Sequence, residues 1–425
     1  MAEVREVDVA VVGAGPAGIA AACRAAEAGA RVLLLDEAPG PGGQIWRQPR
    51  QGTVTAFSPP AAARRWLERL STAGASVRTG FAVVDAPAPR VLLAAAPDGA
   101  TLQVRARAFV IATGARERFL PFPGWTLPGV VGAGGGQALR KSGACFAGLR
   151  VAVAGSGPLL LAVAAALAKA DARLVAVTEQ APGPRVLAFA TSLLHQPRKL
   201  LDGLRYRAAF LGTAYRWGTW VTAAHGDRRL EAITLTDGLR TRTLPCEVLA
   251  IGYGLVPNLE LPRLLGCAVE EAGVAVDESQ QTSLGGVYAA GEITGIGGVD
   301  QALLEGQIAG LAAAGQAEAA QPLFAPRARA RRFAAALEVA FALRPELRSL
   351  PAPDTIVCRC EDVTLGQLRP DWHPRQAKLA SRCGMGPCQA RVCGPALQWL
   401  FGWPTDAVRP PLTPVPIAAL QEDTP

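Results

Sequence analysis

The stretch that decides the fold is Val7–Glu37, VDVAVVGAGPAGIAAACRAAEAGARVLLLDE. An apolar run, a glycine turn, an alanine-rich segment and a second apolar run predict strand, turn, helix and strand. Gly13 permits the tight turn, Gly15 lets the backbone approach a pyrophosphate, and Gly18 lets the helix pack close to the strand. The free amides at the helix N-terminus would face the phosphates. Asp36 follows where an acid binds an adenosine ribose, so the stretch predicts a dinucleotide site.

The same pattern returns at residues 150–180, RVAVAGSGPLLLAVAAALAKADARLVAVTEQ. Here the third glycine of the turn is replaced by Leu160, which should push the helix away from the strand and alter the nucleotide cradle. The second unit is therefore expected to have the fold of a nucleotide domain, while its binding of NAD stays undecided. If a nicotinamide cofactor does bind, Glu179 favours NAD over NADP, because a carboxylate repels a 2′-phosphate.

The length and charge of the chain limit its number of domains and the kinds of partner that it can bind. A chain of 425 residues is expected to form two or three domains. The net charge of +8 is scattered, with one denser patch at 327–332 and no nucleic-acid module, so we expect no nucleic-acid partner. Uncharged runs at 119–139 and 151–168 are broken by proline and glycine, which argues against a transmembrane segment. The N-terminus has no secretory signal pattern, so a cytoplasmic location is predicted.

Five of the nine cysteines lie in two short pieces near the C-terminus, VCRCEDVTLG at 357–366 and SRCGMGPCQARVCG at 381–394. In a reducing compartment, clustered cysteines are better explained as metal ligands than as disulfides. Cys358 and Cys360 form a CxC pair, and Cys388 and Cys393 form a CxxxxC pair. Four thiolates can hold a [2Fe–2S] cluster or a zinc ion, and spacing alone does not separate the two. Cys383 is left over.

Seven pieces of the chain resemble the flavoproteins with two dinucleotide domains that are related to glutathione and thioredoxin reductases. They are VVGAGPAG, VLLLDE, GGQ, IATGA, VAVAGSGP, LAIGYGLVPN and GVYAAGEI, in this order across residues 7–310. The resemblance implies an α/β fold with two Rossmann-like domains of the glutathione-reductase type, the first of which binds FAD. The family usually has aspartate where this chain has Glu292. The candidate cofactor contacts are Gly13, Gly15, Pro16, Ala17, Gly18, Asp36, Glu37, Gly43, Gln44, Val83, Thr113, Gly114, Gly291 and Glu292.

One departure from those reductases is informative. They carry a redox CxxC pair beside the flavin, whereas this chain has no CxxC before residue 358. Dithiol chemistry is therefore not expected, and electrons must leave the flavin by another route, which favours an iron–sulfur cluster over zinc. The four cysteines outside the C-terminal pieces are expected to be small buried hydrophobes: Cys23, Cys145, Cys246 and Cys267.

The C-terminal pieces also resemble the domain shared by anaerobic glycerol-3-phosphate dehydrogenase and bacterioferritin-associated ferredoxin, which binds [2Fe–2S]. That resemblance implies Cys358, Cys360, Cys388 and Cys393 as ligands, with Cys383 as the alternative to Cys388. The predicted divisions of the chain are 1–149 with 246–325 for a discontinuous FAD domain, 150–245 for a second, NAD-like domain, 326–352 for a linker helix, and 353–425 for a small helical [2Fe–2S] domain.

The arrangement as a whole is similar to the FAD-binding alpha subunit of bacterial heteromeric amino-acid dehydrogenases, a group with D-hydroxyproline and proline dehydrogenases, opine oxidases and hydrogen cyanide synthase. Its marks here are PGWTLPGVVGAGGGQALRKSG at 123–143, VAVAGSGPLLLAVA at 151–164 and the cysteine pieces. The resemblance implies that a beta subunit with its own FAD oxidises the C–N bond and that this chain relays electrons. It also allows a small gamma subunit with iron–sulfur clusters, and attachment of the complex to the inner membrane surface. The alternatives are a free-standing NADH-dependent flavin reductase and a zinc-binding assembly module.

Overall fold

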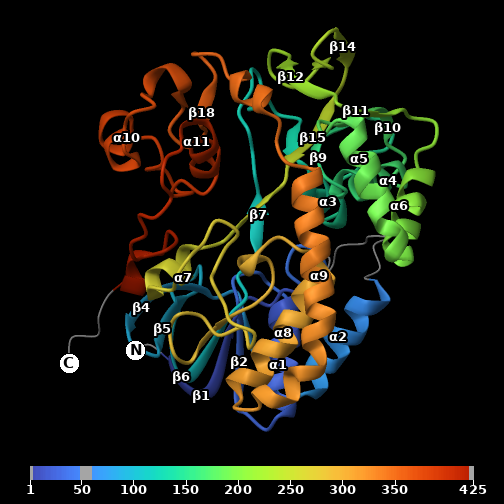
Figure 1. Cartoon of the computed structure of the whole chain (residues 1–425). Coiled ribbons are helices and arrows are strands. Elements are labelled where there is room, and N and C mark those ends of the chain that lie inside the picture. The colour runs from blue at the N-terminus through green and yellow to red at the C-terminus, as the bar shows by residue number, and fades with distance from the viewer. Residues whose placement is uncertain (1–2, 48–59, 421–425) are drawn as a thin grey trace.

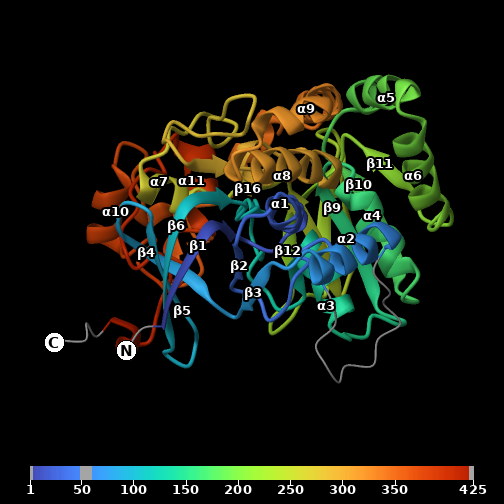
Figure 2. The same cartoon turned by 90° about the horizontal axis from the view of Figure 1, so that it is seen from below.

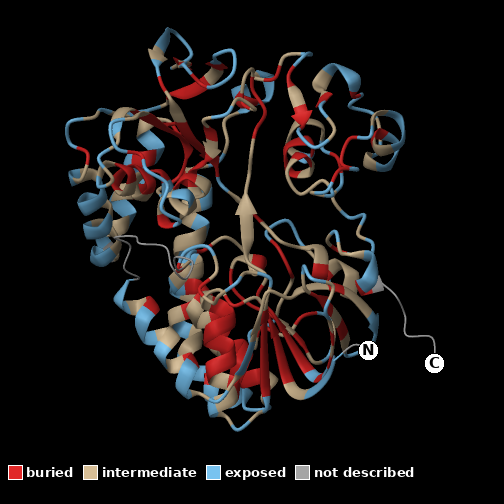
Figure 3. Ribbon diagram, turned by 180° about the vertical axis from the view of Figure 1, so that it is seen from behind, coloured by how far each residue is buried: buried red, intermediate tan, exposed pale blue. Residues whose placement is uncertain are grey.

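The computed structural model describes residues 3–47 and 60–420. In this part of the chain, two large β-sheets form separate units, and the C-terminal cysteines lie in a small third lobe (Figure 1). Buried residues concentrate in the strands and covering helices of each unit (Figure 3). The two units thus have separate hydrophobic cores, as the repeated strand–turn–helix pattern predicts.

The first unit is a mixed sheet with the strand order β3-β2-β1-β6-β5-β4, and β17 pairs with β6. The four neighbouring strands β3, β2, β1 and β6 are parallel to one another, and β5 and β4 form an antiparallel edge. Its strands are β1 (Glu3–Val12), β2 (Val32–Asp36), β3 (Ser76–Thr79), β4 (Ala82–Ala88), β5 (Val91–Ala95), β6 (Thr101–Ile111) and β17 (Val287–Ala289). Its helices are α1 (Pro16–Glu27), α2 (Ala61–Thr72) and α8 (Val299–Ala313).

Helices α1 and α8 lie side by side beside the first sheet (Figure 2). Their crossing is close because small residues meet there. A Cβ atom on Gly306 would overlap the carbonyl of Ala17, and one on Gly310 would overlap the carbonyl of Ala21. The alanine-rich composition of α1 therefore reflects tight helix packing as well as helix propensity.

The second unit is a parallel sheet with the strand order β11-β10-β9-β15-β8. Two of its strands, β8 and β15, lie outside the predicted range of 150–245. Because β15 pairs with β9 and β8 pairs with β15, the unit is wider than predicted. Its strands are β8 (Val130–Gly132), β9 (Arg150–Ser156), β10 (Arg173–Glu179), β11 (Tyr215–Trp217) and β15 (Val248–Tyr253), beside an antiparallel sheet of β12 (Trp220–His225), β13 (Ala232–Thr236) and β14 (Thr241–Pro245). Its helices are α3 (Ala133–Lys141), α4 (Leu159–Ala168), α5 (Gly183–Ser192), η1 (Leu193–His195) and α6 (Pro197–Ala208).

Two short antiparallel strands, β7 (Ala115–Glu117) and β16 (Leu255–Pro257), connect the units (Figure 1). The long helix α9 (Gln321–Ala340) then runs beside both units. The remaining elements are α7 (Glu260–Leu265), η2 (Glu292–Thr294), η3 (Ala317–Ala320) and η4 (Pro345–Ser349), and, in the C-terminal lobe and tail, β18 (Ile356–Cys358), β19 (Val363–Thr364), η5 (Leu365–Gln367), α10 (Pro374–Ser381), α11 (Cys393–Phe401) and η6 (Ile417–Leu420).

The tail after α11 returns to the first unit. The Leu412 amide donates to the carbonyl of Val84 in β4, and the Leu412 side chain joins the core of the first sheet. Residues 353–412 therefore do not form an isolated domain. No helix among the described residues is long and apolar enough to cross a membrane.

Candidate cofactor and metal sites

The first glycine turn leaves open space at its apex. A Cβ atom on Gly13, whose φ is +101°, would overlap the carbonyl of Ala112, and one on Gly18 would overlap the carbonyl of Gly13. At Gly15, by contrast, no atom of the described residues lies within 4 Å of a built Cβ atom. Gly13 and Gly18 are thus glycines because of their protein neighbours, while Gly15 borders a space that a pyrophosphate would fit.

Asp36 lies at the end of β2, beside that turn. Its carboxylate accepts the amide of Ala14 at 2.5 Å and the amide of Ala38 at 2.7 Å. Burial raises the pKa of Asp36, and the hydrogen bonds from the two backbone amides oppose that shift. Gly43 covers the other side of the turn, since its Cβ atom would lie 2.9 Å from the Cα atom of Gly15. Glu37 and Gln44 are exposed at the rim, and Val83 is partly buried against the core of the first sheet.

The ATG residues at 112–114 are held by Asn258, which directly follows β16. The side-chain amide of Asn258 donates to the carbonyl of Thr113 at 2.7 Å, and the Thr113 hydroxyl donates to the carbonyl of Asn258 at 3.1 Å. The backbone amide of Asn258 donates to the carbonyl of Gly114 at 3.0 Å. Asn258 ends the piece LAIGYGLVPN, and nothing in that piece indicates this role.

Glu292 follows Gly291, whose Cβ atom would lie 2.7 Å from the Cβ atom of Ala17 on α1. The Oε1 atom of Glu292 accepts the amide of Gly298 at 2.7 Å. Its Oε2 atom is buried, and no donor among the described residues reaches it. Burial raises the pKa of this carboxyl group. A buried acceptor without a donor is costly, so this atom fits a bound ligand that carries hydroxyl groups, as the ribityl chain of FAD does.

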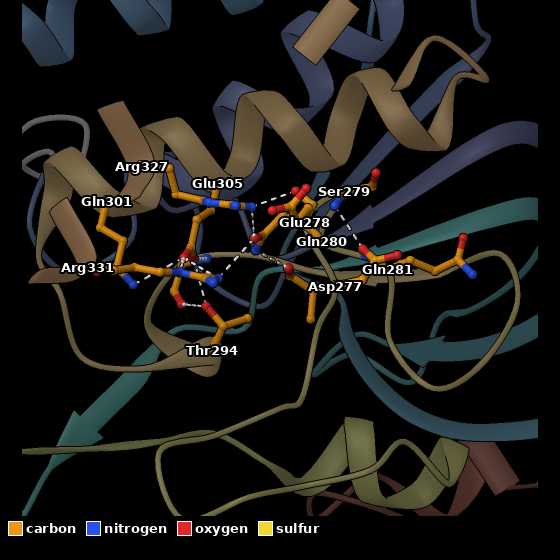
Figure 4. Close-up of polar contacts among 12 residues, drawn as sticks. Asp277, Glu278, Ser279, Gln280, Gln281, Thr294, Gln301, Glu305, Arg327 and Arg331 are labelled. Atoms are coloured by element: carbon orange, nitrogen blue, oxygen red, sulfur yellow. Dashed lines mark hydrogen bonds and ion pairs between the residues drawn. The ribbon is translucent and has the colours of Figure 1, made fainter. Parts of the chain in front are cut away.

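A buried polar network holds the Gly291 turn, and sequence reasoning missed it (Figure 4). Glu305 of α8 is fully buried and accepts the amide of Gly291 at 3.0 Å and the hydroxyl of Thr294 at 2.6 Å. Arg331 of α9 donates to Glu305 at 2.9 Å and to the side-chain oxygen of Gln280 at 3.0 Å. The arginine-rich patch at 327–332 thus contributes a side chain that neutralises a buried carboxylate beside the cofactor turn.

The second glycine turn is held by hydrogen bonds to other parts of the chain. Glu179 is fully buried and accepts the amides of Gly157 at 2.7 Å and Ala181 at 2.8 Å. Burial raises its pKa to about 7. The Ser156 hydroxyl donates to the carbonyl of Phe341 at 2.8 Å, so the chain that follows α9 lies directly against this turn. Gln180 donates to the next carbonyl, that of Ala342, at 3.2 Å.

All five C-terminal cysteines gather in the third lobe. Cys358, Cys383 and Cys393 are buried, and their sulfur atoms lie within 4.8 Å of one another, the one such group of three or more potential metal ligands found among the described residues. Cys360 and Cys388 interact with each other in an adjoining, more exposed position. The structure therefore brings two of the four predicted ligands, Cys358 and Cys393, together with Cys383, the leftover cysteine, and leaves Cys360 and Cys388 as a separate pair outside that group.

The thiols of the buried trio favour one thiolate. Interactions with the Cys383 and Cys393 thiols lower the pKa of Cys358 to about 2, and the same contact with Cys358 raises the pKa of Cys383 to about 12. The Gly384 amide donates to the Cys358 sulfur at 3.5 Å. A Cβ atom on Gly386 would overlap that of Cys360, so glycine is needed where the two cysteine loops meet. Amides directed at sulfur suit a metal-bound thiolate.

The other cysteines do not form a redox pair. Cys23, Cys246 and Cys267 are buried, and burial raises the pKa of Cys23 and of Cys246 to about 11. The expectation of a buried hydrophobe was wrong for Cys145, which is exposed just beyond α3.

A cleft of about 1610 Å³ lies between the three lobes, lined by Thr294, Tyr253 and Cys383 among others. Its walls thus include Thr294, three residues after Gly291, as well as the buried Cys383 and Cys393.

The comparisons with known proteins agree with this geometry. The family profile described as pyridine nucleotide-disulphide oxidoreductase matches residues 7–319. An opine oxidase subunit from Rhizobium meliloti (strain 1021) is 34% identical, over 98% of this chain and 98% of that protein. Hydrogen cyanide synthase subunit HcnB of Pseudomonas aeruginosa is 33% identical, over 97% of each chain.

Two solved structures show the same fold. L-proline dehydrogenase from P. horikoshii superposes with a TM-score of 0.66 at 20% identity, over 99% of this chain and 81% of that one. Thioredoxin reductase of T. acidophilum superposes with a TM-score of 0.57 at 23% identity, over 74% of this chain and 99% of that one. The first likeness extends through the cysteine lobe, and the second is consistent with the two dinucleotide units alone.

Proposed function

Because the chain belongs to the pyridine nucleotide-disulphide oxidoreductase family of flavoprotein oxidoreductases, we propose that it is the electron-transferring subunit of a heteromeric amino- or imino-acid dehydrogenase. Its relatives of similar length are named as subunits, of opine oxidase and of hydrogen cyanide synthase. The observation that carries the proposal is one chain with a glycine turn open at Gly15, no CxxC pair before residue 358, and five gathered cysteines. This combination suits electron transfer between two bound redox groups.

The first unit would bind FAD through the turn at 13–18, with Asp36 toward the ribose and Glu292 toward the hydroxylated chain of the cofactor. Gly43 would cover the pyrophosphate from the opposite side. Thr113 and Gly114, held by Asn258, would line the flavin side. FAD would supply the ability to take up reducing equivalents in pairs, and an iron–sulfur cluster would supply transfer of single electrons.

We infer that Cys358, Cys360, Cys388 and Cys393 hold a [2Fe–2S] cluster. Cys358 interacts with Cys393 as well as with Cys383, and Cys360 interacts with Cys388, so the lobe offers two cysteine pairs, one for each iron atom. The buried trio that includes Cys383 supports a second candidate, a structural zinc ion held by Cys358, Cys383 and Cys393 with one further ligand. In that case the lobe would serve assembly.

The substrate would be recognised mainly by the partner subunit, for which we propose a second FAD-containing chain, with or without a small iron–sulfur subunit. The second turn is also open at Gly157, where a built Cβ atom meets nothing within 4 Å, but Ser156 and Gln180 already bind the chain after α9, so NAD binding has less support than FAD binding at the first turn. A free-standing NADH-dependent flavin reductase is therefore the weaker candidate. Rapid bleaching of the flavin by NADH without a partner protein would favour it.

The test is to purify the chain without oxygen, alone and together with its co-purifying native partner. Flavin, iron, acid-labile sulfide and zinc are measured, and a visible spectrum is recorded. The proposal expects about one flavin, two irons and two sulfides per chain, as one FAD and one [2Fe–2S] cluster require. Zinc without iron or sulfide would replace the electron-transfer proposal with the assembly one.

A further inference from the structure

We propose that Arg116 is a positioning residue that fixes the cysteine lobe against the flavin-facing turn. The inference rests on the proposed function. Arg116 lies on β7, the strand that connects the two dinucleotide units. Its side chain is three-quarters covered, and its guanidinium group reaches two places far from it in the sequence, the segment with Asn258 and Glu260 and the loop with Arg391.

Each nitrogen of the guanidinium group has its own acceptor. The Nη1 atom donates to the side-chain oxygen of Asn258 at 2.7 Å, and the Nη2 atom lies 2.8 Å from a carboxylate oxygen of Glu260. The Nε atom donates to the backbone carbonyl of Arg391 at 3.1 Å. The planar fork of arginine permits all three bonds at once, which the single ammonium of lysine does not reproduce.

One end of this bridge is the flavin-facing turn. Asn258 uses its side-chain amide and its backbone amide to hold the carbonyls of Thr113 and Gly114, at 2.7 and 3.0 Å. Its remaining side-chain oxygen is the atom that accepts from Arg116. A displacement of Arg116 would therefore move Asn258 and weaken the hydrogen bonds that hold Thr113 and Gly114.

The other end is the cysteine loop. Arg391 lies between Cys388 and Cys393, and its backbone amide donates to the Cys388 carbonyl at 3.0 Å. The Arg391 side chain donates to the carbonyl of Leu412 at 2.6 Å and lies 3.7 Å from Glu260. The carbonyl that Arg116 binds thus belongs to a loop that is fixed on both sides and carries two of the proposed ligands.

The test compares Arg116→Met, which has a similar aliphatic length but no donors, with the milder Arg116→Lys. Arg348→Met is the matched control, because the Arg348 guanidinium carbon lies 5.0 Å from the ring centre of Trp399 in the same lobe but is not part of this bridge. The first readout is hydrogen exchange of the full chain as purified, over residues 255–260 and 386–393. The second is the rate at which the cluster is reduced after light, with EDTA as the sacrificial donor, has reduced the flavin.

We expect Arg116→Met to retain flavin, iron and sulfide, to exchange about tenfold faster in both segments, and to reduce the cluster about tenfold more slowly, because it loses hydrogen bonds from a charged donor. Arg116→Lys should show a smaller change, and Arg348→Met should show neither effect. Parental values for Arg116→Met in both readouts, or an equal slowing in Arg348→Met, would overturn the assignment. A parent chain without a cluster would refute the proposed function, and the exchange data would then decide the positioning role alone. If Arg116→Met does not fold, parental values for Arg116→Lys overturn the assignment.

Discussion

Gly15→Ala should separate flavin binding from folding. Gly15 has φ −75° and ψ −176°, a conformation open to any residue, and its Cβ atom meets no described atom within 4 Å. Alanine should therefore stabilise the chain without cofactor by about 0.4–1 kcal/mol, through a smaller unfolded-state entropy. The added methyl group would nevertheless occupy the space that the pyrophosphate needs, so we expect the purified variant to lack flavin.

The magnitude follows from linkage. A parent chain in FAD at about 100 times its Kd gains about 2.7 kcal/mol of unfolding free energy, whereas the variant gains close to none. Urea unfolding with and without added FAD measures both quantities, and absorbance gives the flavin content. Gly285→Ala is the control, because its Cβ atom also meets nothing within 4 Å, in a loop far along the chain from the turn.

Gly18→Ala gives the contrasting result. Its Cβ atom would overlap the carbonyl of Gly13, so the variant should lose about 1–3 kcal/mol even without FAD. A well-folded Gly15→Ala chain with full flavin content would refute the assignment of the turn. A Gly15→Ala chain that is destabilised without FAD would refute the claim that its protein surroundings leave room for a side chain.

Three further predictions concern the cysteine lobe and the second unit. Cys388→Ser should remove iron and sulfide but retain FAD, whereas Cys383→Ser should retain the cluster; the opposite pattern of iron content would exchange the two in the ligand set. Gly386→Ala should also lower iron content, since its Cβ atom would overlap that of Cys360, and parental iron would contradict this. The folded-state pKa of Glu179 is raised from 4.5 to about 7, so its contribution to stability falls as pH rises between those values. Glu179→Gln should remove up to roughly 3 kcal/mol of that fall, measured by urea unfolding near pH 5 and pH 8; identical pH profiles would contradict it.

The sequence was sufficient for the features that depend on neighbouring residues. The strand, turn and helix around Gly13 are specified by local periodicity and by glycines whose spacing has a steric cause. The limits of the second unit were not predictable in this way. Val130–Gly132 is a short strand, and its membership of the second sheet depends on pairing with residues 249–251, more than a hundred positions away.

The same reason explains the residues that sequence reasoning missed around the sites. Glu305 and Arg331 belong to different helices, and only their packing brings both to the turn at Gly291. In the sequence, Arg331 is only one member of the basic patch at 327–332, and nothing local to that patch indicates a buried partner. Cys383 was set aside on spacing, yet the fold of the 381–394 loop places its sulfur beside those of Cys358 and Cys393.

Helix α9 connects these observations. Arg331, in its second half, binds the carboxylate that holds the Gly291 turn of the first unit. Directly after its last turn, the carbonyls of Phe341 and Ala342 bind Ser156 and Gln180 at the second glycine turn. One helix thus fixes both dinucleotide units, and its continuation leads to the cysteine lobe. A disulfide reductase must expose a dithiol beside its flavin to a changing partner, whereas electron transfer between two resident groups requires a constant separation. The second turn of this chain holds a connector, and such a contact would help to keep that separation constant if the chain transfers electrons as proposed.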